Sequence, residues 1–398
     1  MILAQRIRLA PNNVQASFLE RCAGAARFTY NWGLARWQEI HAVGGTPSWR
    51  TLNAEINARK DRDLGWLRDL PWAVPNTALA DLGRAFGHFF RRVKAGQRPG
   101  YPRFKAKKRC TPAFAIEGRA IHFDGRRVHL PKLGWVRTRQ PPRFPGRVLS
   151  ARFSKHAGHW DLAIQVEIDE TRWTYPHRCE TQAAVGVDLG VVDLAVLSTG
   201  EHVPAPRSLR HHAAQLRRLN KELSRRTRGG QNWQKTKAKL GLLHEHIAHV
   251  RHAATHALTA SLVHHFRWIG IEDLHVAAMM RGRLATSLQD AAMAEVRRQL
   301  AYKAPLAGST VVVADRFYPS SKTCATCGVI YADLALNERR WTCESCGAEH
   351  DRDENAAENL YQLAAAQAVT ACRHESAGAL RDAQLSLGQE SGHAVSFG

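Results

Sequence analysis

The chain has little of what membrane proteins, secreted proteins and nucleotide-loop enzymes display. No stretch reaches the roughly 18 consecutive apolar residues that a membrane-spanning helix needs, and Met1–Arg6 lacks the apolar core of a secretory signal peptide. The sequence also has no long internal repeat and no glycine-rich phosphate loop. These absences predict a cytoplasmic protein with no membrane partner, and 398 residues suffice for two or three domains.

Acidic residues are scarce compared with basic ones. The chain holds 35 Asp and Glu against 57 Lys and Arg, a formal charge of +22 and a pI near 10.2. A balance this basic indicates a polyanionic partner, because phosphate contacts release counterions and long-range attraction steers approach. A ribosomal-type or membrane-surface protein could also be this basic. Nucleic acid is favoured here because the basic residues are interleaved with aromatic ones instead of forming a tail.

Cysteine is also too sparse for a disulfide framework. Cys22, Cys110, Cys179 and Cys372 are scattered, whereas the other four form two C-x-x-C pairs with fifteen residues between them: Cys324, Cys327, Cys343 and Cys346. Such paired knuckles predict one tetrahedral zinc ion bound by four thiolates in a reducing cytosol. Gly328 and Gly347 follow the pairs and suit the tight turn of each knuckle. A closed set of four cysteines leaves no open coordination position, so this zinc is expected to be structural.

The first 180 residues have a mixed α/β pattern. Residues 2–9 alternate like a strand, and short alternating strands with Gly and Pro turns return over 113–168. The pattern predicts a small β-barrel or sandwich into which helices are inserted. We expect one helix to begin at Asn12/Asn13, a second to span about 28–41 before the break at 44–47, and a third to span about 76–93 with an apolar aromatic stripe.

A strongly basic segment follows the third helix. Residues 91–109 contain nine Lys or Arg and no acid, with aromatic side chains between them. A solvated loop would explain the charge but not the aromatics. We therefore predict a segment that contacts the nucleic-acid backbone and stacks on bases, through Arg91, Arg92, Arg98, Tyr101, Arg103, Phe104, Lys105 and Lys107.

Residues 181–360 contain the predicted chemistry. Buried strands are expected at 183–188, 191–198, 266–272 and 309–315, alternating with helices, which indicates a mixed sheet covered on both faces. Between them, 207–227 and 232–265 have the apolar spacing of an antiparallel helical hairpin. Arg207 to Lys239 includes eleven Lys or Arg and one acid, Glu222. This excess of positive charge predicts that the surface of the helical hairpin binds nucleic acid. The predicted contacts are Arg217, Arg218, Arg225 and Arg226.

Three widely separated acids stand where strands end or a helix begins. Asp188 and Glu272 each close an apolar run, and Asp353 precedes a helix expected over 354–367. Convergent carboxylates can hold two Mg²⁺ ions, which activate a water and stabilise the leaving oxygen in phosphodiester hydrolysis. The pattern therefore predicts Asp188, Glu272 and Asp353 as a catalytic, metal-binding set.

Four neighbouring acids are weaker candidates: Asp193, Asp273, Asp315 and Asp351. Asp273 is expected on the opposite sheet face from Glu272, because side chains alternate along a strand. Asp315 closes a strand and could support the site from behind. Asp351 could be a ligand or a helix cap.

These motifs, in this order, resemble the transposon-encoded TnpB nucleases, which are related to compact type V CRISPR effectors. The resemblance covers nearly the whole chain. It is carried by Arg27–Trp32, Ala85–Arg92, Gly100–Lys105, Leu130–Gly134, Glu272–Leu274, Ser320–Cys324 and His350–Asp353.

The resemblance implies a RuvC nuclease domain of RNase H-like fold with an inserted zinc ribbon, plus a wedge domain and a helical recognition domain. It implies cleavage of double-stranded DNA beside a short adjacent motif, directed by a guide RNA from the end of the element. It places the protein with the bacterial nucleoid, as a monomer in its ribonucleoprotein. Asp188, Glu272 and Asp353 match the family's catalytic positions, and Asn76 and Thr77 match the helix that reads the adjacent motif.

The domain boundaries that follow are specific. The wedge-like β-barrel comprises 1–10 and 95–180, with the helical recognition domain at 11–94. The RuvC domain comprises 181–317 and 348–362, with the helical hairpin 207–265 as an insert and the zinc ribbon at 318–347. Residues 363–398 turn small and polar, which predicts a flexible C-terminal tail.

Other functions are compatible with parts of this pattern. A nuclease-inactive RNA-guided repressor would share the fold, although such proteins typically lack catalytic acids and this chain has all three. A guide-free transposase or junction resolvase would share the metal chemistry. A CRISPR effector would differ in its genomic neighbours and not in its residues.

Overall fold

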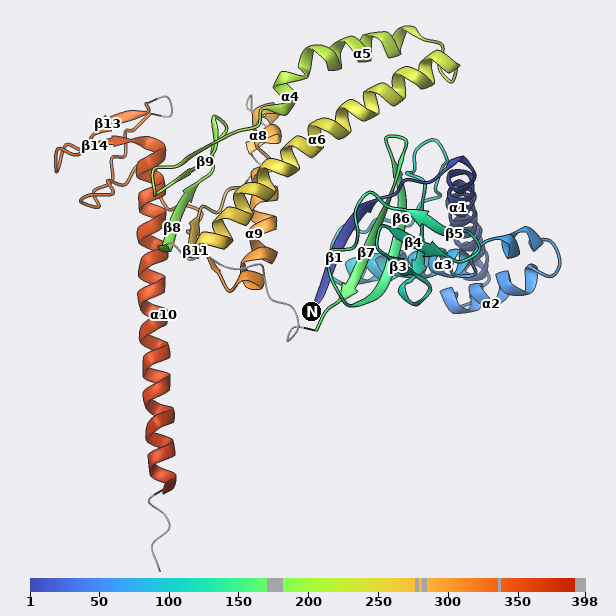
Figure 1. Ribbon diagram of the computed structural model, residues 1–398, viewed down its shortest axis with the longest axis horizontal. Helices are drawn as coiled ribbons and strands as arrows, with labels where there is room; N and C mark the ends of the chain where they lie inside the picture. The colour runs from blue at the N-terminus through green and yellow to red at the C-terminus, as the bar shows by residue number, and fades with distance from the viewer. Residues whose placement is uncertain (170–181, 276–278, 281–284, 336–337, 391–398) are drawn as a thin grey trace, which may run out of the picture. The chain divides into compact units, whose positions relative to one another are not determined.

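The computed structural model describes residues 1–169, 182–275, 279–280, 285–335 and 338–390. The chain divides into two compact units, Met1–Thr174 and Tyr175–Gly398, which are considered separately (Figure 1). Within the described residues, no helix combines the length and apolarity that crossing a membrane requires. The predicted wedge–nuclease boundary at 180/181, and Cys179, lie outside the described residues.

The first unit contains two antiparallel sheets. The larger has the order β1 (Ile2–Arg8), β7 (His159–Glu167), β6 (Arg147–His156), β2 (Ala113–Glu117). The smaller comprises β3 (His122–Asp124), β4 (Arg127–Leu130) and β5 (Gly134–Arg137). A bridge between Leu9 and Thr138 joins the end of β1 to the end of β5. Alternation along β7 buries Trp160, Leu162, Ile164 and Val166 in the core of this unit.

Three helices lie between β1 and β2 in the chain, as the insertion pattern predicts: α1 (Asn13–Ala42), α2 (Trp49–Arg59) and α3 (Ala73–Lys94). Asn12 caps α1 with a capping box to Gln15. The prediction of one helix from Asn12/Asn13 and a second over about 28–41 was wrong, because α1 is a single helix from Asn13 to Ala42. Helix α2 was not predicted, although its capping residue Ser48 and the buried pair Leu52 and Ile56 were visible signals.

The aromatic stripe of α3 is only partly core. Phe86 is buried and stacks on Trp37 with 4.1 Å between ring centroids, whereas Phe90 is 52% exposed. Tyr101 packs edge-on against both Phe86 and Phe89. The start of the basic segment is therefore attached to α3 through aromatic contacts.

The second unit is built on a five-stranded mixed sheet with the order β10 (His202–Pro204), β9 (Asp193–Leu197), β8 (Gln182–Asp188), β11 (Phe266–Ile271), β12 (Thr310–Val313). Strands β8, β11 and β12 are parallel, and β9 and β10 continue the sheet in antiparallel pairing. The predicted strands are confirmed, and the short edge strand β10 is an addition to them. Because β8 and β11 run parallel in register, with Val187 beside Ile271, they end side by side.

Helices cover both faces of this sheet. Val185 and Val187 of β8 and Ile269 and Ile271 of β11 are buried in one cluster with residues of α6 (Gln231–His265) and α9 (Met293–Ala307). The intervening Gly186 and Gly270 contact α10 (Arg352–Glu390) on the other face. The short α8 (Ala285–Ala291) adds Leu288 and Ala291 to the α6/α9 side.

The predicted helical hairpin is confirmed. After α4 (Ser208–His211), α5 (Ala213–Arg225) and α6 run side by side and extend away from the sheet (Figure 1). Their contact is a small apolar cluster of Leu216, Leu219, Leu243 and Ile247.

The cysteine knuckles flank a two-stranded ribbon, β13 (Arg340–Thr342) and β14 (Glu349–Asp351), which leads directly into α10. Helix α10 runs to Glu390, past the expected helix end at residue 367, so residues 363–390 of the predicted tail are helical. Residues 363–390 are rich in Ala, with several Leu and Gln, which have high intrinsic helix propensity. Because the segment is polar and its apolar residues show little periodicity, the sequence pattern did not indicate this part of the helix.

Candidate active site

Asp188 and Glu272 lie on the same face of the sheet, at neighbouring strand ends. Residues 185 and 187 of β8 face α6 and α9, so alternation places Gly186 and Asp188 on the α10 face. In β11 the same alternation puts Gly270 and the following Glu272 on the α10 face. The two carboxylates therefore project toward α10, whose first turn includes Asp353.

Two glycines allow that helix to lie directly on the sheet. A Cβ atom on Gly186 would stand 1.9 Å from the carbonyl oxygen of Ala357, and one on Gly270 would stand 2.2 Å from that of Leu360. Any side chain at either position would push α10 outward. Asp353 is one helical turn before Ala357 and is thereby held near the end of β8.

The charges of Glu272 and Asp353 both act on Asp188, so the three acids belong to one electrostatic neighbourhood. Asp188 keeps part of its surface accessible but is surrounded by protein atoms, and this desolvation is the largest cause that raises its carboxyl pKa. The negative charges of Glu272 and then Asp353 add to it and the positive charges of Arg339 and Arg352 oppose it, so that the pKa is about 8. The site therefore holds more negative charge than its own cations balance.

Each of the other two acids has a defined partner. Ser320 Oγ donates a hydrogen bond to Glu272 Oε1. Arg339 Nη1 binds both carboxylate oxygens of Asp353, each at 2.7 Å. Arg339 is about half exposed, so it can move to solvent when a metal ion takes its place.

The competing acids are engaged elsewhere. Asp273 pairs with Arg297 and Arg316 on the opposite face from Glu272, as alternation along the strand predicts. Asp351 accepts hydrogen bonds from the backbone N–H groups of Asp353 and Glu354, so it caps α10. Asp315 accepts one from the N–H of Phe317 within its own turn. Asp193 binds the His202 ring at 3.0 Å.

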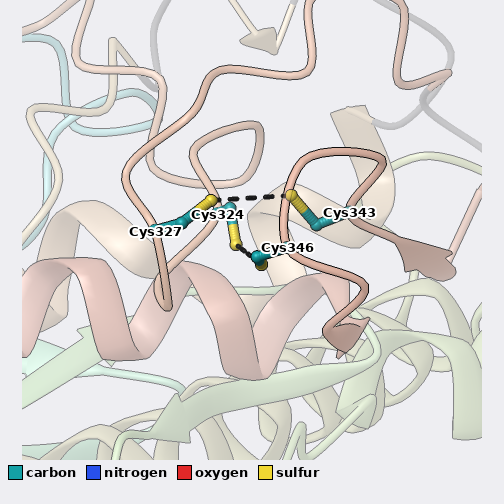
Figure 2. Close-up of side chains that lie close together, drawn as sticks. All are labelled: Cys324, Cys327, Cys343 and Cys346. Carbon is teal, nitrogen blue, oxygen red and sulfur yellow. Dashed lines mark hydrogen bonds between the residues drawn. The ribbon is translucent and has the colours of Figure 1, made fainter.

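The four knuckle cysteines converge on one point (Figure 2). Cys324 and Cys346 have their sulfur atoms 3.7 Å apart, and Cys327 and Cys343 have theirs 3.6 Å apart. A tetrahedron of sulfurs around zinc at about 2.3 Å has edges of about 3.8 Å. The donor set and its spacing thus fit a tetrathiolate zinc ion.

Local structure favours the thiolate form of Cys324. Burial raises its pKa, but backbone N–H groups of Cys327 and Thr326 and the nearby His350 ring lower it more, to about 5. His350 Nε2 lies 3.1 Å from the sulfur, at hydrogen-bond distance. Gly328 and Gly347 have φ of +78° and +74°, so each knuckle ends in a left-handed turn that favours glycine, as the sequence predicts.

Two asparagines join the ribbon to α10. Asn355 and Asn359 are buried, and both donate side-chain hydrogen bonds to the carbonyl oxygens of Ser320 and Thr323. Asn355 also accepts the N–H of Ala325 at 2.9 Å. The sequence prediction did not include these residues, although two asparagines four apart at the start of a helix were a visible signal of one polar face.

The residues predicted to contact nucleic acid differ in availability. In the first unit, Lys105 lies over the Tyr30 ring, 3.6 Å from its centroid, and Thr77 donates to the carbonyl oxygen of Ala115. Asn76 is half-buried, and its Oδ1 is enclosed. The remaining side chains are exposed: Arg91, Arg92, Arg98, Tyr101, Arg103, Phe104 and Lys107.

The same division holds on the hairpin of the second unit. Arg226 pairs with Glu222 and the carbonyl oxygen of Asn232, so it closes the hairpin turn. Arg217, Arg218 and Arg225 are exposed.

Comparison with known proteins identifies the family. A relative from Streptomyces pristinaespiralis named "Putative RNA-guided DNA endonuclease" is 34% identical, covering 93% of this chain and 90% of its own. InsQ of Escherichia coli K12, with the same description, is 33% identical over 93% of each chain. This chain belongs to the TnpB family.

Family models match three parts of this TnpB chain. The IS605 OrfB model, described as "Probable transposase", matches residues 163–283, which include Asp188 and Glu272. The Cas12f1-like TNB domain matches 294–360, which include the four cysteines and Asp353. A helix-turn-helix domain matches 1–46, which hold β1, α1 and the start of the turn toward α2.

Solved structures add only a weak similarity. A Cas12f1–sgRNA–target DNA complex aligns with 91% of this chain and 99% of its own at 14% identity and a TM-score of 0.34. A CRISPR-Cas12f ternary complex covers 87% of this chain and 81% of its own at 13% identity and a TM-score of 0.36. These scores are too low to support a structural argument.

Proposed function

We propose that this TnpB-family protein is an RNA-guided DNA endonuclease that cleaves double-stranded DNA beside a short adjacent motif. The observation that carries the proposal is the convergence of Asp188, Glu272 and Asp353 on one face of the mixed sheet. The mixed sheet, with β8, β11 and β12 parallel and β9 and β10 antiparallel, supports the assignment of a RuvC-type, RNase H-like nuclease domain. Homologues named as RNA-guided DNA endonucleases support the same conclusion.

The donor set at these acids fits Mg²⁺. All three side chains offer carboxylate oxygens, the ligands that hard divalent cations prefer. The raised pKa of Asp188 reflects burial first, and then the negative charges of Glu272 and Asp353, which Arg339 and Arg352 only partly oppose. Two Mg²⁺ ions bound here would activate a water and stabilise the leaving oxygen.

The chain's own side chains prepare this site. Ser320 holds one oxygen of Glu272 and so fixes the orientation of that carboxylate. Arg339 neutralises Asp353 when no metal is bound and must release it before a cation can enter. Asp188 carries a proton below about pH 8 and must lose it to become a ligand.

The remaining parts serve the nucleic acids. We assign 1–10 and 95–180 to a wedge domain, 11–94 to a recognition domain, 318–347 to a zinc ribbon, and 181–317 with 348–362 to the nuclease domain. One chain would bind one guide RNA in the bacterial nucleoid. The exposed basic and aromatic side chains of 91–107 and of α5 would contact phosphates and bases, whereas Lys105 and Arg226 have internal roles.

The first experiment is to purify the protein with its RNA and sequence that RNA. The ribonucleoprotein is then given Mg²⁺ and a plasmid library in which a guide-matched target has randomised flanks. We expect cleavage next to one short flanking motif. Failure to cut any library member, with guide RNA shown to be bound, would contradict the proposal.

Two alternatives give different results in this assay. A nuclease-inactive repressor would bind the target and give equal, background cleavage for wild type and Asp188→Ala. A guide-free transposase or resolvase would act on DNA in protein stripped of RNA. Three acids at one site favour the nuclease over the repressor.

A further inference from the structure

Two histidines and a glutamate gather on the helices behind the sheet, remote in the fold from the zinc ribbon. His252 and His256 are four residues apart on α6, and Glu295 lies in the first turn of α9. One ligand atom of each residue lies within 4.8 Å of the others. Nδ1 of His252 is 3.8 Å from Oε1 of Glu295.

We propose that His252, His256 and Glu295 form a binding site for a divalent transition-metal ion such as Zn²⁺, Ni²⁺ or Co²⁺. Histidines at i and i+4 share one helix face, which is the spacing by which a helix presents two imidazoles to one ion. A carboxylate from a second helix completes a three-ligand face with open positions for water. Imidazole ligands favour these ions over Mg²⁺ and Ca²⁺.

Buried hydrogen bonds hold the two helices in the required alignment. Gln299 of α9 is buried, donates from Nε2 to Thr255 at 3.0 Å, and accepts from Thr259 at 2.8 Å. Lys303 donates to Thr259 at 2.7 Å and to the carbonyl oxygen of His256 at 3.1 Å. The backbone around His256 is thus fixed to α9 before any ion binds.

The same glutamine orients the carboxylate. Gln299 Nε2 also donates to Glu295 Oε1 at 3.0 Å. A fixed partner behind a metal ligand is what lowers the cost of ordering that ligand when the ion binds. The site therefore has both its ligands and a supporting residue.

Arg298 is the competitor. Its Nε and Nη2 bind the two oxygens of Glu295 at 2.8 and 2.6 Å. The side chain is 61% exposed, so it can swing into water and free one carboxylate oxygen. Because Arg298 and a metal ion would compete for the same carboxylate, removing Arg298 should strengthen metal binding. A network that serves only as an ion pair gives no reason to expect this.

The test uses the full-length, tag-free protein with its cysteine site loaded with zinc. Co²⁺ or Ni²⁺ is titrated by calorimetry, and for Co²⁺ the visible absorption is recorded as well. We expect one additional equivalent to bind, without the thiolate charge-transfer bands that replacement of zinc at the cysteines would produce. Mg²⁺ at the same concentration should not compete.

Variants then locate the ion. His252→Ala, His256→Ala and Glu295→Gln should each weaken binding by at least about tenfold, whereas Arg298→Ala should bind more tightly than wild type. His249→Ala is the matched control, since His249 is an exposed histidine of α6 outside the cluster, paired with Glu245. Circular dichroism checks that each variant is folded.

Absence of an additional equivalent would overturn the proposal. So would an equivalent that persists in the double variant His252→Ala/His256→Ala, that is lost in His249→Ala, or that is indifferent to Glu295→Gln. None of these readouts depends on DNA cleavage, so the site and the nuclease function are tested separately.

Discussion

Asn359 donates a hydrogen bond from Nδ2 to the carbonyl oxygen of Thr323 at 2.7 Å. This bond ties α10, whose first turn includes Asp353, to the residue before Cys324. Asn355 makes a bond of the same length to the same oxygen. The neighbouring Ser320, whose carbonyl oxygen both asparagines also bind, donates from its hydroxyl to Glu272. The zinc ribbon is therefore connected to two of the three acids through backbone that the asparagines hold in place.

Removing one asparagine should cost less than removing both. In Asn359→Ala each carbonyl oxygen keeps Asn355 as a donor, so we expect a loss of about 1 kcal/mol in the free energy of unfolding. In Asn355→Ala/Asn359→Ala both buried oxygens lose their side-chain donors, and the loss should exceed the sum of the single variants by about 0.5 kcal/mol or more. Urea denaturation measures all three. Gln362→Ala is the control, because Gln362 makes an exposed bond to Ala325. Additive losses in the double variant would contradict the view that the two asparagines share these carbonyl acceptors.

Gly186→Ala should displace α10 from the sheet. The new methyl group would meet the Ala357 carbonyl oxygen at 1.9 Å, and the three nearest atoms all belong to the α10 backbone, so no flexible side chain can yield. We expect destabilisation of about 3 kcal/mol or more together with loss of cleavage. Gly87→Ala in α3 is the matched control: nothing lies within 4 Å of its Cβ position, so this change should be neutral or stabilising by up to about 1 kcal/mol. Equal stability of the two variants would refute the close contact.

Zinc removal should inactivate the enzyme and unfold the ribbon, while the rest of the protein stays folded. The ribbon core is small, with Leu334, Trp341 and Tyr331 around the cysteines, so it depends on the ion for stability. Chelation at constant Mg²⁺ should abolish cleavage and expose the ribbon to protease, and zinc should restore both. The control is Cys22→Ser, since Cys22 is a buried thiol of the first unit. Full activity in protein shown to be zinc-free would contradict this role.

The raised pKa of Asp188 predicts how pH acts on the metal-free protein. Its ordinary value is 3.8, and in the folded chain it is about 8. Between these values the folded protein keeps a proton that the unfolded chain has lost, so this carboxyl's contribution to stability is complete below about pH 4 and disappears as pH rises through 8. Metal-free protein should lose stability between about pH 4 and 8, and Asp188→Asn should lose less. Identical pH profiles would contradict the shift.

The same proton opposes metal binding. Because Mg²⁺ needs the ionised carboxylate, its apparent affinity should rise by up to about tenfold per pH unit below pH 8 and level off above it. Calorimetry at several pH values measures this slope. An affinity independent of pH from 6 to 8 would mean that Asp188 does not carry this proton in the metal-free site.

The sequence predicted the elements that carry this site better than it predicted their extent. Strand ends at Asp188 and Glu272 were predictable because a buried strand has an apolar run that stops at a charge. The opposite facing of Asp273 followed from alternation alone. The zinc ligands were predictable because two knuckle pairs have one common chemistry.

The remaining features depend on packing that local patterns do not encode. The continuity of α1 through Gly24 is decided by tertiary contact, since glycine only weakens a helix. The inward placement of Lys105 over Tyr30 joins residues 75 positions apart, and no local pattern marks that pair. The shared role of Asn355 and Asn359 requires knowing which backbone carbonyl oxygens face α10.

Single-turnover cleavage of a guide-matched duplex, bound before Mg²⁺ is added, tests the central claim most directly. Asp188→Asn, Glu272→Gln and Asp353→Asn should each bind RNA and target as wild type does and cut at least about a thousandfold more slowly, the scale of removing a catalytic group. Asp273→Asn, whose carboxylate faces away from the site, should retain its activity to within a few fold. A wild-type cleavage rate in any one of the first three variants would contradict a shared three-carboxylate metal centre.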